Sequence, residues 1–182
     1  MKLELRRQFV HMLAILFIFV FQFLGKWNTA ILLFIGVILF IIIGKIRTTK
    51  KIKIVQKFET NIIKKYEREN EFPFKGAITL LLGIIFAILL FQENIAVACI
   101  VVLSISDSLS TIIGKIYGKH IILNSTIEGS IGFLISAFII LLFFTNPLKA
   151  FFVAIIGAII ELIPFVDDNL IIPLVIGVLL TL

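Results

Sequence analysis

The chain has 182 residues, 60% of them hydrophobic and 19 of them Phe, and a formal net charge of +6. Ordinary globular domains are roughly 45–50% apolar, so the composition argues against a water-soluble fold and for one integral membrane domain over residues 1–182. Cys99 is the only cysteine, which excludes a disulfide framework and a cysteine metal cluster. The apolar run after Arg7 lacks an A-x-A-like cleavage site, so we expect a retained first helix.

Seven apolar stretches follow one another along the chain. A helix that spans a bilayer needs roughly 20 mostly apolar residues, and several stretches fall short of that length. We therefore expect an all-α bundle of about seven transmembrane helices, with six helices and a re-entrant segment as the alternative. The stretches are Phe9–Leu24, Thr29–Ile46, Ala77–Phe91, Ile95–Ile113, Ile131–Phe144, Leu148–Ile163 and Leu170–Leu182.

The segment 47–75 between the second and third stretches carries nine basic and four acidic residues. Its apolar residues Val55, Phe58, Ile62 and Tyr66 recur at helical spacing. This pattern predicts a cytoplasmic loop that forms an amphipathic helix on an anionic leaflet. The loop accounts for most of the net charge, so we expect no nucleic-acid partner.

The basic residues also predict the orientation of the chain. With a cytoplasmic N-terminus, only Lys26 and Lys149 of the 17 Lys and Arg residues fall outside, as the positive-inside rule requires. The same orientation brings the segments around Asp107, Glu128 and Asp167 to the cytoplasmic face. Nucleoside triphosphates and Mg²⁺ are available on that side.

Five carboxylates interrupt the apolar sequence between Ile95 and the C-terminus. A charged side chain at bilayer depth costs on the order of 2.5–3.5 kcal/mol on insertion scales, so such residues usually face a site or a partner. These acids are the first candidates for a functional site: Asp107, Glu128, Glu161, Asp167 and Asp168.

Asp107 lies among four serines and is followed by Gly114-Lys115 and Gly118-Lys119. A carboxylate oxygen suits a divalent metal, glycines let the backbone approach a phosphate, and lysines neutralise its charge. The alternative is a Gly-x3-Gly helix-packing face, which explains the glycines but not the acid.

A second motif is Glu128-Gly129-Ser130. Ser125 and Glu128 have the spacing of a capping box, which satisfies the amides at a helix start without a ligand. A helix N-terminus also binds phosphate, so the two interpretations are compatible.

The third motif is Asp167-Asp168-Asn169, with Glu161 one to two helical turns before it. Adjacent acids can cap a helix or hold Mg²⁺, which is commonly bound by one or two carboxylates together with substrate phosphates. Glu161 is either buried against a polar partner or part of the same cluster.

Polar residues also mark the first and third apolar stretches. Glu4, Arg7 and His11 are spaced by three and four residues and share one helical face. An interfacial histidine is the simpler interpretation of His11, and a ligand role is the alternative. Lys75 and Gly83 could approach a phosphate, although helix packing is favoured for Gly83.

This order of motifs resembles the CTP-dependent lipid-alcohol kinases, which include dolichol kinase, phytol kinase and polyprenol kinases. The resemblance covers nearly the whole chain, and the Glu-Gly-Ser and Asp-Asp-Asn motifs are its more specific parts. Ser125 and Thr126 replace the Lys-Ser that members commonly carry. The matching residues are Glu4-Leu5-Arg6-Arg7-x3-His11, Lys75-Gly76-Ala77 with Gly83, Asp107-x6-Gly114-x3-Gly118-Lys119, Glu128-Gly129-Ser130 and Glu161-x5-Asp167-Asp168-Asn169-x3-Pro173.

The resemblance implies transfer of the γ-phosphate of CTP to the hydroxyl of a membrane isoprenoid such as dolichol, phytol or another polyprenol, with Mg²⁺ as cofactor. Asp107, Asp167, Asp168 and Asn169 would hold the metal. Glu161 or one of the aspartates, Asp107 or Asp168, would orient the alcohol. The residues expected at the nucleotide are Gly114, Lys115, Gly118, Lys119, Glu128, Gly129, Ser130 and Lys75, with Arg7 and His11 as further candidates.

Other functions remain open at this stage. A cytidylyltransferase of the CDP-diacylglycerol or CDP-archaeol synthase type also combines an Asp, spaced glycines and Glu-Gly. A diacylglycerol kinase differs only in its acceptor. A small cation or proton transporter would use the acids as a relay. A homo-oligomer is compatible with each.

Overall fold

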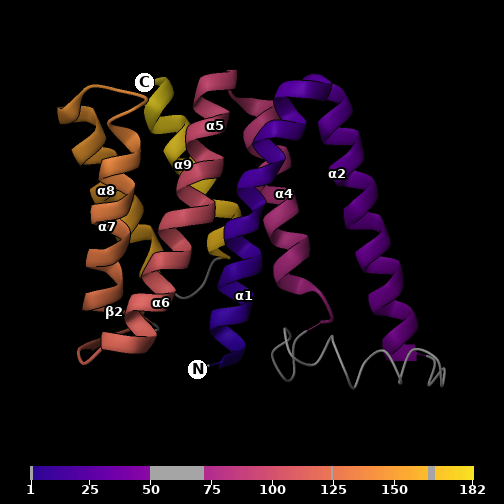
Figure 1. Ribbon diagram of the computed structural model, residues 1–182, viewed down its shortest axis with the longest axis horizontal. Helices are drawn as coiled ribbons and strands as arrows, with labels where there is room; N and C mark the ends of the chain where they lie inside the picture. Colours follow the sequence, from indigo (N-terminus) through magenta and orange to yellow (C-terminus); the bar gives the residue numbers. More distant parts are fainter. Residues whose placement is uncertain (1, 50–71, 124, 164–166) are drawn as a thin grey trace.

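The computed structural model describes residues 2–49, 72–123, 125–163 and 167–182. Most of these residues are helical, and a hairpin whose two strands have two residues each joins α6 to α7 (Figure 1). Most of the expected amphipathic segment 47–75 lies outside them. The elements are α1 Lys2–Met12, η1 Leu13–Leu16, α2 Phe17–Thr49, α4 Lys75–Leu90, α5 Glu93–Val101, η3 Val102–Ser106, α6 Asp107–Tyr117, β1 Ile121–Ile122, β2 Ser125–Thr126, α7 Ile127–Leu141, α8 Pro147–Glu161 and α9 Asp168–Thr181.

The helices run alternately up and down between two ends of a bundle (Figure 1). The N-terminus, the end of α2, the start of α4 and the β1–β2 hairpin lie at the lower end of the view, which we call the hairpin end. The turn at the top of α2 and the C-terminus lie at the opposite end. Consequently, motifs far apart in the sequence are brought toward the hairpin end.

The first long helical stretch bends at Gly25. This glycine has a φ of 77° and a ψ of 175°, outside the helical region, within the range assigned to α2. A positive φ is accessible to glycine at little cost, so the chain reverses there. The bend falls between the expected stretches Phe9–Leu24 and Thr29–Ile46.

Two stretches, Leu3–Arg47 and Glu93–Tyr117, are long and apolar enough to cross a membrane. Other apolar helices are shorter, with 16 residues in α4, 15 in α7 and 14 in α9. At 1.5 Å per residue these helices are about 21–24 Å long, less than the ~30 Å hydrocarbon core. The protein is therefore mostly helical with two candidate membrane helices, and helix length alone does not establish seven crossings.

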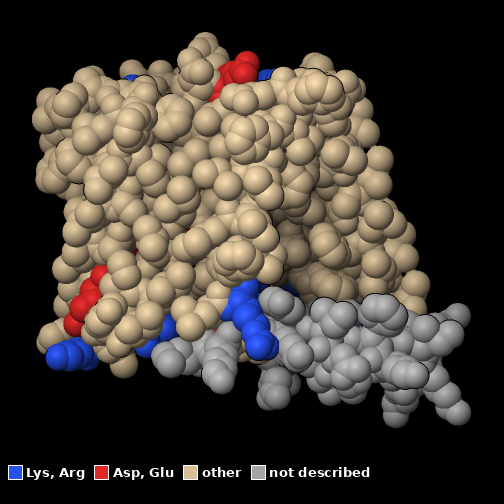
Figure 2. Space-filling model, in the orientation of Figure 1, with Lys and Arg blue, Asp and Glu red and all other residues tan. Residues whose placement is uncertain are grey.

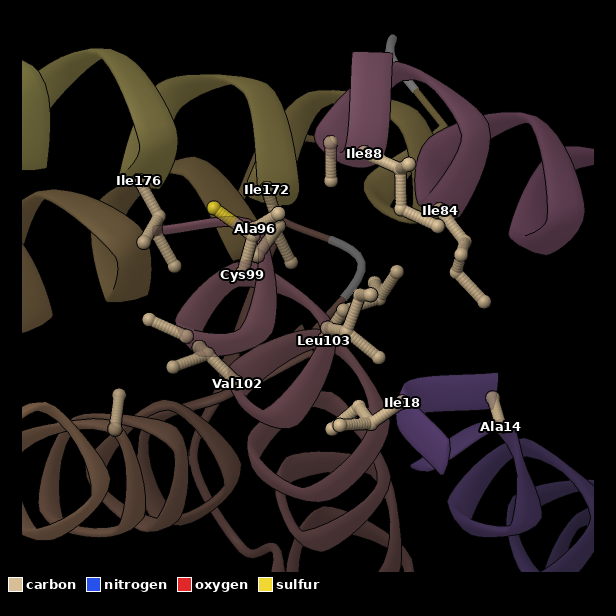
Figure 3. Close-up of a cluster of buried hydrophobic side chains, with 14 of the residues drawn as sticks. Ala14, Ile18, Ile84, Ile88, Ala96, Cys99, Val102, Leu103, Ile172 and Ile176 are labelled. Carbon is tan, nitrogen blue, oxygen red and sulfur yellow. The ribbon is translucent and has the colours of Figure 1, made fainter. Parts of the chain in front are cut away.

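Apolar side chains form both the interior and much of the surface. Leu103 of η3 and Ile172 of α9 are fully buried in the core that Figure 3 shows. By contrast, Phe23 and Trp27 are 89% and 70% exposed. On the face in Figure 2, charged side chains gather at the two ends and leave an apolar middle. This distribution suits a protein surrounded by lipid.

A close contact between α4 and α9 fixes the start of α9. A Cβ atom added at Gly83 would overlap the backbone carbonyl oxygen of Asn169. The Asn169 side-chain amide donates to Thr79 Oγ1 at 3.0 Å and to the Gly76 carbonyl at 3.4 Å. The packing role predicted for Gly83 is confirmed, and it places Asp168 beside α4.

Glycines also allow α6 and α7 to approach each other. A Cβ at Gly114 would lie 2.7 Å from Thr126 Oγ1, and one at Gly129 would lie 2.9 Å from the Ser110 carbonyl. A Cβ added at Gly118 would lie 2.7 Å from the methyl group of Thr126. The Gly-x3-Gly packing alternative thus accounts for these glycines, and contact with a phosphate stays a prediction.

Candidate functional site

Four of the five acids lie within electrostatic range of one another. Asp107 begins α6, Glu161 ends α8, Asp167 is the N-cap residue of α9 and Asp168 follows it. Asp107 interacts electrostatically with Glu161 and Asp167, and Asp168 interacts with Asp107, Glu161 and Asp167. We call these four residues the carboxylate cluster.

Glu161 is held by serine hydroxyls from three elements. Its Oε1 accepts from Ser110 of α6 at 2.7 Å and from Ser125 of β2 at 2.8 Å. Its Oε2 accepts from Ser130 of α7 at 2.8 Å. Hydrogen bonds to an ionised acceptor are about twice as strong as neutral ones, so this carboxylate joins α6, α7 and α8.

A π-helical turn, η3, directly precedes Asp107. Such turns are rare and occur frequently at functional sites. Asp107 is only 8% exposed, and its Oδ2 lies 3.6 Å from His11 Nε2 on α1. The Ser108 hydroxyl donates to the Gln8 backbone carbonyl at 3.4 Å, so α1 packs on α6 at two adjacent points.

Among the described residues, Arg7 is the cation that lies beside this cluster. It interacts electrostatically with Asp107 and forms an ion pair with Glu4 at 3.0 Å. Its Nη2 also faces the backbone at Gly76, where an added Cβ would lie 3.6 Å away. Lys75, the first residue of α4, is exposed next to it.

Two lysines expected at the nucleotide lie further out. Lys115 and Lys119 are exposed near the end of α6. Lys115 is eight residues beyond Asp107, which is about 12 Å along the helix axis. Their role at a triphosphate remains a prediction.

The Glu128 motif is organised differently from the predicted capping box. Thr126, not Ser125, is the N-cap residue of α7, and its Oγ1 accepts from the Gly129 amide at 3.1 Å. Ser125 instead binds Glu161. Glu128 pairs with His120 at 2.8 Å, and this hydrogen bond lowers the pKa of the Glu128 carboxyl. The capping prediction was therefore right about the helix start but wrong about the residues.

The contacts of the serines that hold Glu161 were not predicted: Ser130 was expected at the nucleotide and Ser125 as a helix cap, and both donate to Glu161 instead. Ser110 is one of the four serines around Asp107, and this polar run in an apolar stretch is the signal that the sequence offers. Their partner could not be identified, because Glu161 is 51 residues from Ser110 in the sequence. Ser125 and Thr126 both have structural partners, Glu161 and the Gly129 amide.

The oxygen atoms of Asp167 and Asn169 near the start of α9 are ligands of the kind that suits a hard divalent cation. Asp167 makes no side-chain capping bond to α9, and the Asn169 amide nitrogen is occupied by α4, which leaves its amide oxygen as an acceptor. Within the described ranges, no group of three or more His, Cys, Asp or Glu residues is close enough to hold a metal by itself. Mg²⁺ usually shares its coordination among one or two carboxylates, phosphates and water.

Comparisons with known proteins give a relative without an assigned role. An uncharacterized protein of Rickettsia prowazekii (strain Madrid E) is 29% identical over 183 residues, covering 94% of this chain and 90% of that protein. No family model matches the chain. No solved structure matches it either.

The Glu161 contacts predict a specific stability effect. Ser130→Ala removes a hydroxyl that donates to a carboxylate, and such bonds contribute roughly 1.5–3 kcal/mol. Ser136→Ala is the matched control on the same helix, because the Ser136 hydroxyl bonds only to the Gly132 and Phe133 carbonyls of α7. We expect Ser130→Ala to lower the thermal midpoint in detergent clearly more than Ser136→Ala. Equal midpoints would contradict the anchoring role of Glu161.

Proposed function

We propose that the protein is a membrane lipid-alcohol kinase that transfers the γ-phosphate of a nucleoside triphosphate, CTP in this proposal, to the hydroxyl of an isoprenoid alcohol. The observation that carries the proposal is the carboxylate cluster beside Arg7 and the π-helical turn, inside an otherwise apolar bundle. The motif resemblance to CTP-dependent kinases adds the choice of nucleotide and acceptor.

The proposed membrane arrangement has about seven crossings and a cytoplasmic N-terminus. Two long apolar stretches support it, together with the alternating direction of the shorter helices (Figure 1). The short helices would be accommodated by local thinning of the bilayer. In this orientation the hairpin end faces the cytoplasm, where the nucleotide enters.

Phosphoryl transfer asks mainly for positioning and charge neutralisation. Arg7 and Lys75 would bind the triphosphate at the cytoplasmic edge of the cluster. Mg²⁺ would be held by Asp107, Asp167, Asp168 and the Asn169 amide oxygen. When bound, this ion neutralises charge on the phosphate oxygens. Glu161 would keep α6, α7 and α8 in place around them.

The reaction joins the alcohol oxygen to the γ-phosphorus and breaks the bond between that phosphorus and the β–γ bridging oxygen. The leaving group departs as CDP, and the hydroxyl proton passes to an adjacent carboxylate of the cluster. The lipid product is a monophosphate that remains in the bilayer.

Labelled CTP tests this function directly. Purified protein incubated with Mg²⁺, γ-labelled CTP and a C15 to polyprenyl alcohol panel should place the label in the lipid fraction. Asp107→Asn should reduce transfer by at least a hundredfold while insertion into membranes is unchanged. Lipid label from α-labelled CTP alone would instead identify a cytidylyltransferase. Near-normal transfer by Asp107→Asn would remove that residue from the mechanism.

Arg7 and Arg6 form a matched pair for testing the nucleotide edge. Arg7 is partly buried beside Asp107, whereas Arg6 is exposed on the same helix. Each change to Gln removes one positive charge from the same segment, so any effect on membrane orientation is shared. We expect Arg7→Gln to raise the KM for CTP about tenfold or more and Arg6→Gln to change it less than twofold. The proposal for Arg7 fails if the two variants behave alike.

A further inference from the structure

A polar seam runs between α1 and the start of α6. Gln8 is 7% exposed and Asp107 is 8% exposed, and the His11 and Asp107 side chains are each 11% exposed. Ser108 joins α6 to the Gln8 backbone. We use the term α1 seam for Gln8, His11 and Asp107.

Several atoms in and near this seam have no hydrogen-bond partner. Among the described residues, the buried side-chain atoms without a partner include Gln8 Oε1 and His11 Nε2, together with the hydroxyls of Ser104 and Ser106. These serines belong to η3, which packs against α1. A buried unsatisfied polar group costs roughly 1–3 kcal/mol, and each one in a native structure calls for an explanation such as an absent ligand or water.

The spacing of two of these groups suits a third polar atom between them. His11 Nε2 and Asp107 Oδ2 are 3.6 Å apart, beyond the ~2.7–3.2 Å of an ordinary hydrogen bond. An oxygen atom beside this pair can reach both at about 2.8 Å, an ordinary hydrogen-bond length. One small polar group bonded to both atoms would therefore give the His11 nitrogen the partner that it lacks.

The charge and the hydrogen-bonding groups around the seam indicate which small polar group would bind there. Gln8 Oε1 and the Asp107 carboxylate are acceptors, while Ser104 and Ser106 carry hydroxyl donors. A phosphate beside Asp107 at this point would meet negative charge and a further acceptor. A neutral hydroxyl, by contrast, can donate its proton to Gln8 Oε1 or to the Asp107 carboxylate. Anionic phosphate therefore belongs at the Arg7 edge, and a hydroxyl belongs in the seam.

The surroundings of the seam favour an alcohol with an apolar tail. Phe9, Val10 and Leu13 on α1 are exposed by 64%, 50% and 44%, next to the seam residues in the sequence. In the membrane arrangement proposed above, these side chains face lipid. In this proposal, a lipid alcohol approaches the seam from the lipid side of α1, and its chain stays in hydrocarbon.

We propose that Gln8 and His11, with Asp107, form the binding site for the acceptor hydroxyl of the isoprenoid alcohol. This inference rests on the proposed kinase function and extends it, because it separates the acceptor site from the nucleotide edge. Gln8 and His11 are positioning residues, and Glu161, whose oxygens already accept three hydroxyls, is not the group that orients the alcohol.

Kinetics of matched variants test the acceptor site. Gln8→Leu replaces the polar side chain with an apolar one of similar volume and so removes the amide group, and His11→Phe removes the ring nitrogens. Each should raise the KM for the alcohol at least tenfold and change the KM for CTP less than twofold. Gln22→Leu, an exposed position on α2, should leave both constants unchanged. Parallel changes in both KM values, or no change in either, would overturn the assignment.

Photocrosslinking tests binding without catalysis. A C15 isoprenoid alcohol with a diazirine next to its hydroxyl, added without nucleotide, should label peptides containing residues 8–11 or 104–107. An excess of the unmodified alcohol should abolish this labelling. Labelling there without any γ-phosphate transfer would retain the hydroxyl site and reject the kinase. Transfer with labelling confined to other helices would retain the kinase and reject the site.

Discussion

Carboxyl groups set among apolar helices are the constraint on which this structure depends. The Glu161 carboxylate is stabilised by hydroxyls of Ser110, Ser125 and Ser130, each between 2.7 and 2.8 Å away. Those serines come from α6, β2 and α7, so one acid at the end of α8 determines how three elements meet. Glycines at the α6–α7 contact bring the backbones close enough for these bonds.

The position of the cluster suits a reaction between a soluble and a lipid substrate. Ser110 lies seven residues, about 10 Å, inside the end of α6. The cluster thus lies inside the bundle, near the hairpin end. Arg7 lies on its outer side, toward Lys75, and the α1 seam adjoins exposed apolar residues. In the proposed function, a triphosphate from water and an alcohol from hydrocarbon would meet there without either leaving its own solvent completely.

Apolar runs and charges predicted much of the fold but few of the site's contacts. Hydropathy predicts the boundary between the first two stretches, near Gly25, and the packing role of Gly83. The positions of the charges predict that Asp107 and Asp168 lie at the same end of the bundle. The partners of Glu161 do not, because serine hydroxyls on three elements have no sequence periodicity that points to one acid. The capping-box spacing also predicted the wrong N-cap residue for α7. Ser125 fits a capping box, but tertiary packing brings its hydroxyl to Glu161, to which it donates.

Binding of Mn²⁺ in place of Mg²⁺ tests the central claim most directly, because both ions take octahedral oxygen ligands. Electron paramagnetic resonance with a non-hydrolysable CTP analogue should show bound Mn²⁺ in the unaltered protein. The affinity should fall at least tenfold in Asp168→Asn and in Asp107→Asn, but not in Glu93→Gln, which alters an exposed acid at the start of α5. Equal Mn²⁺ affinity in all four proteins would contradict a nucleotide-metal site at the carboxylate cluster.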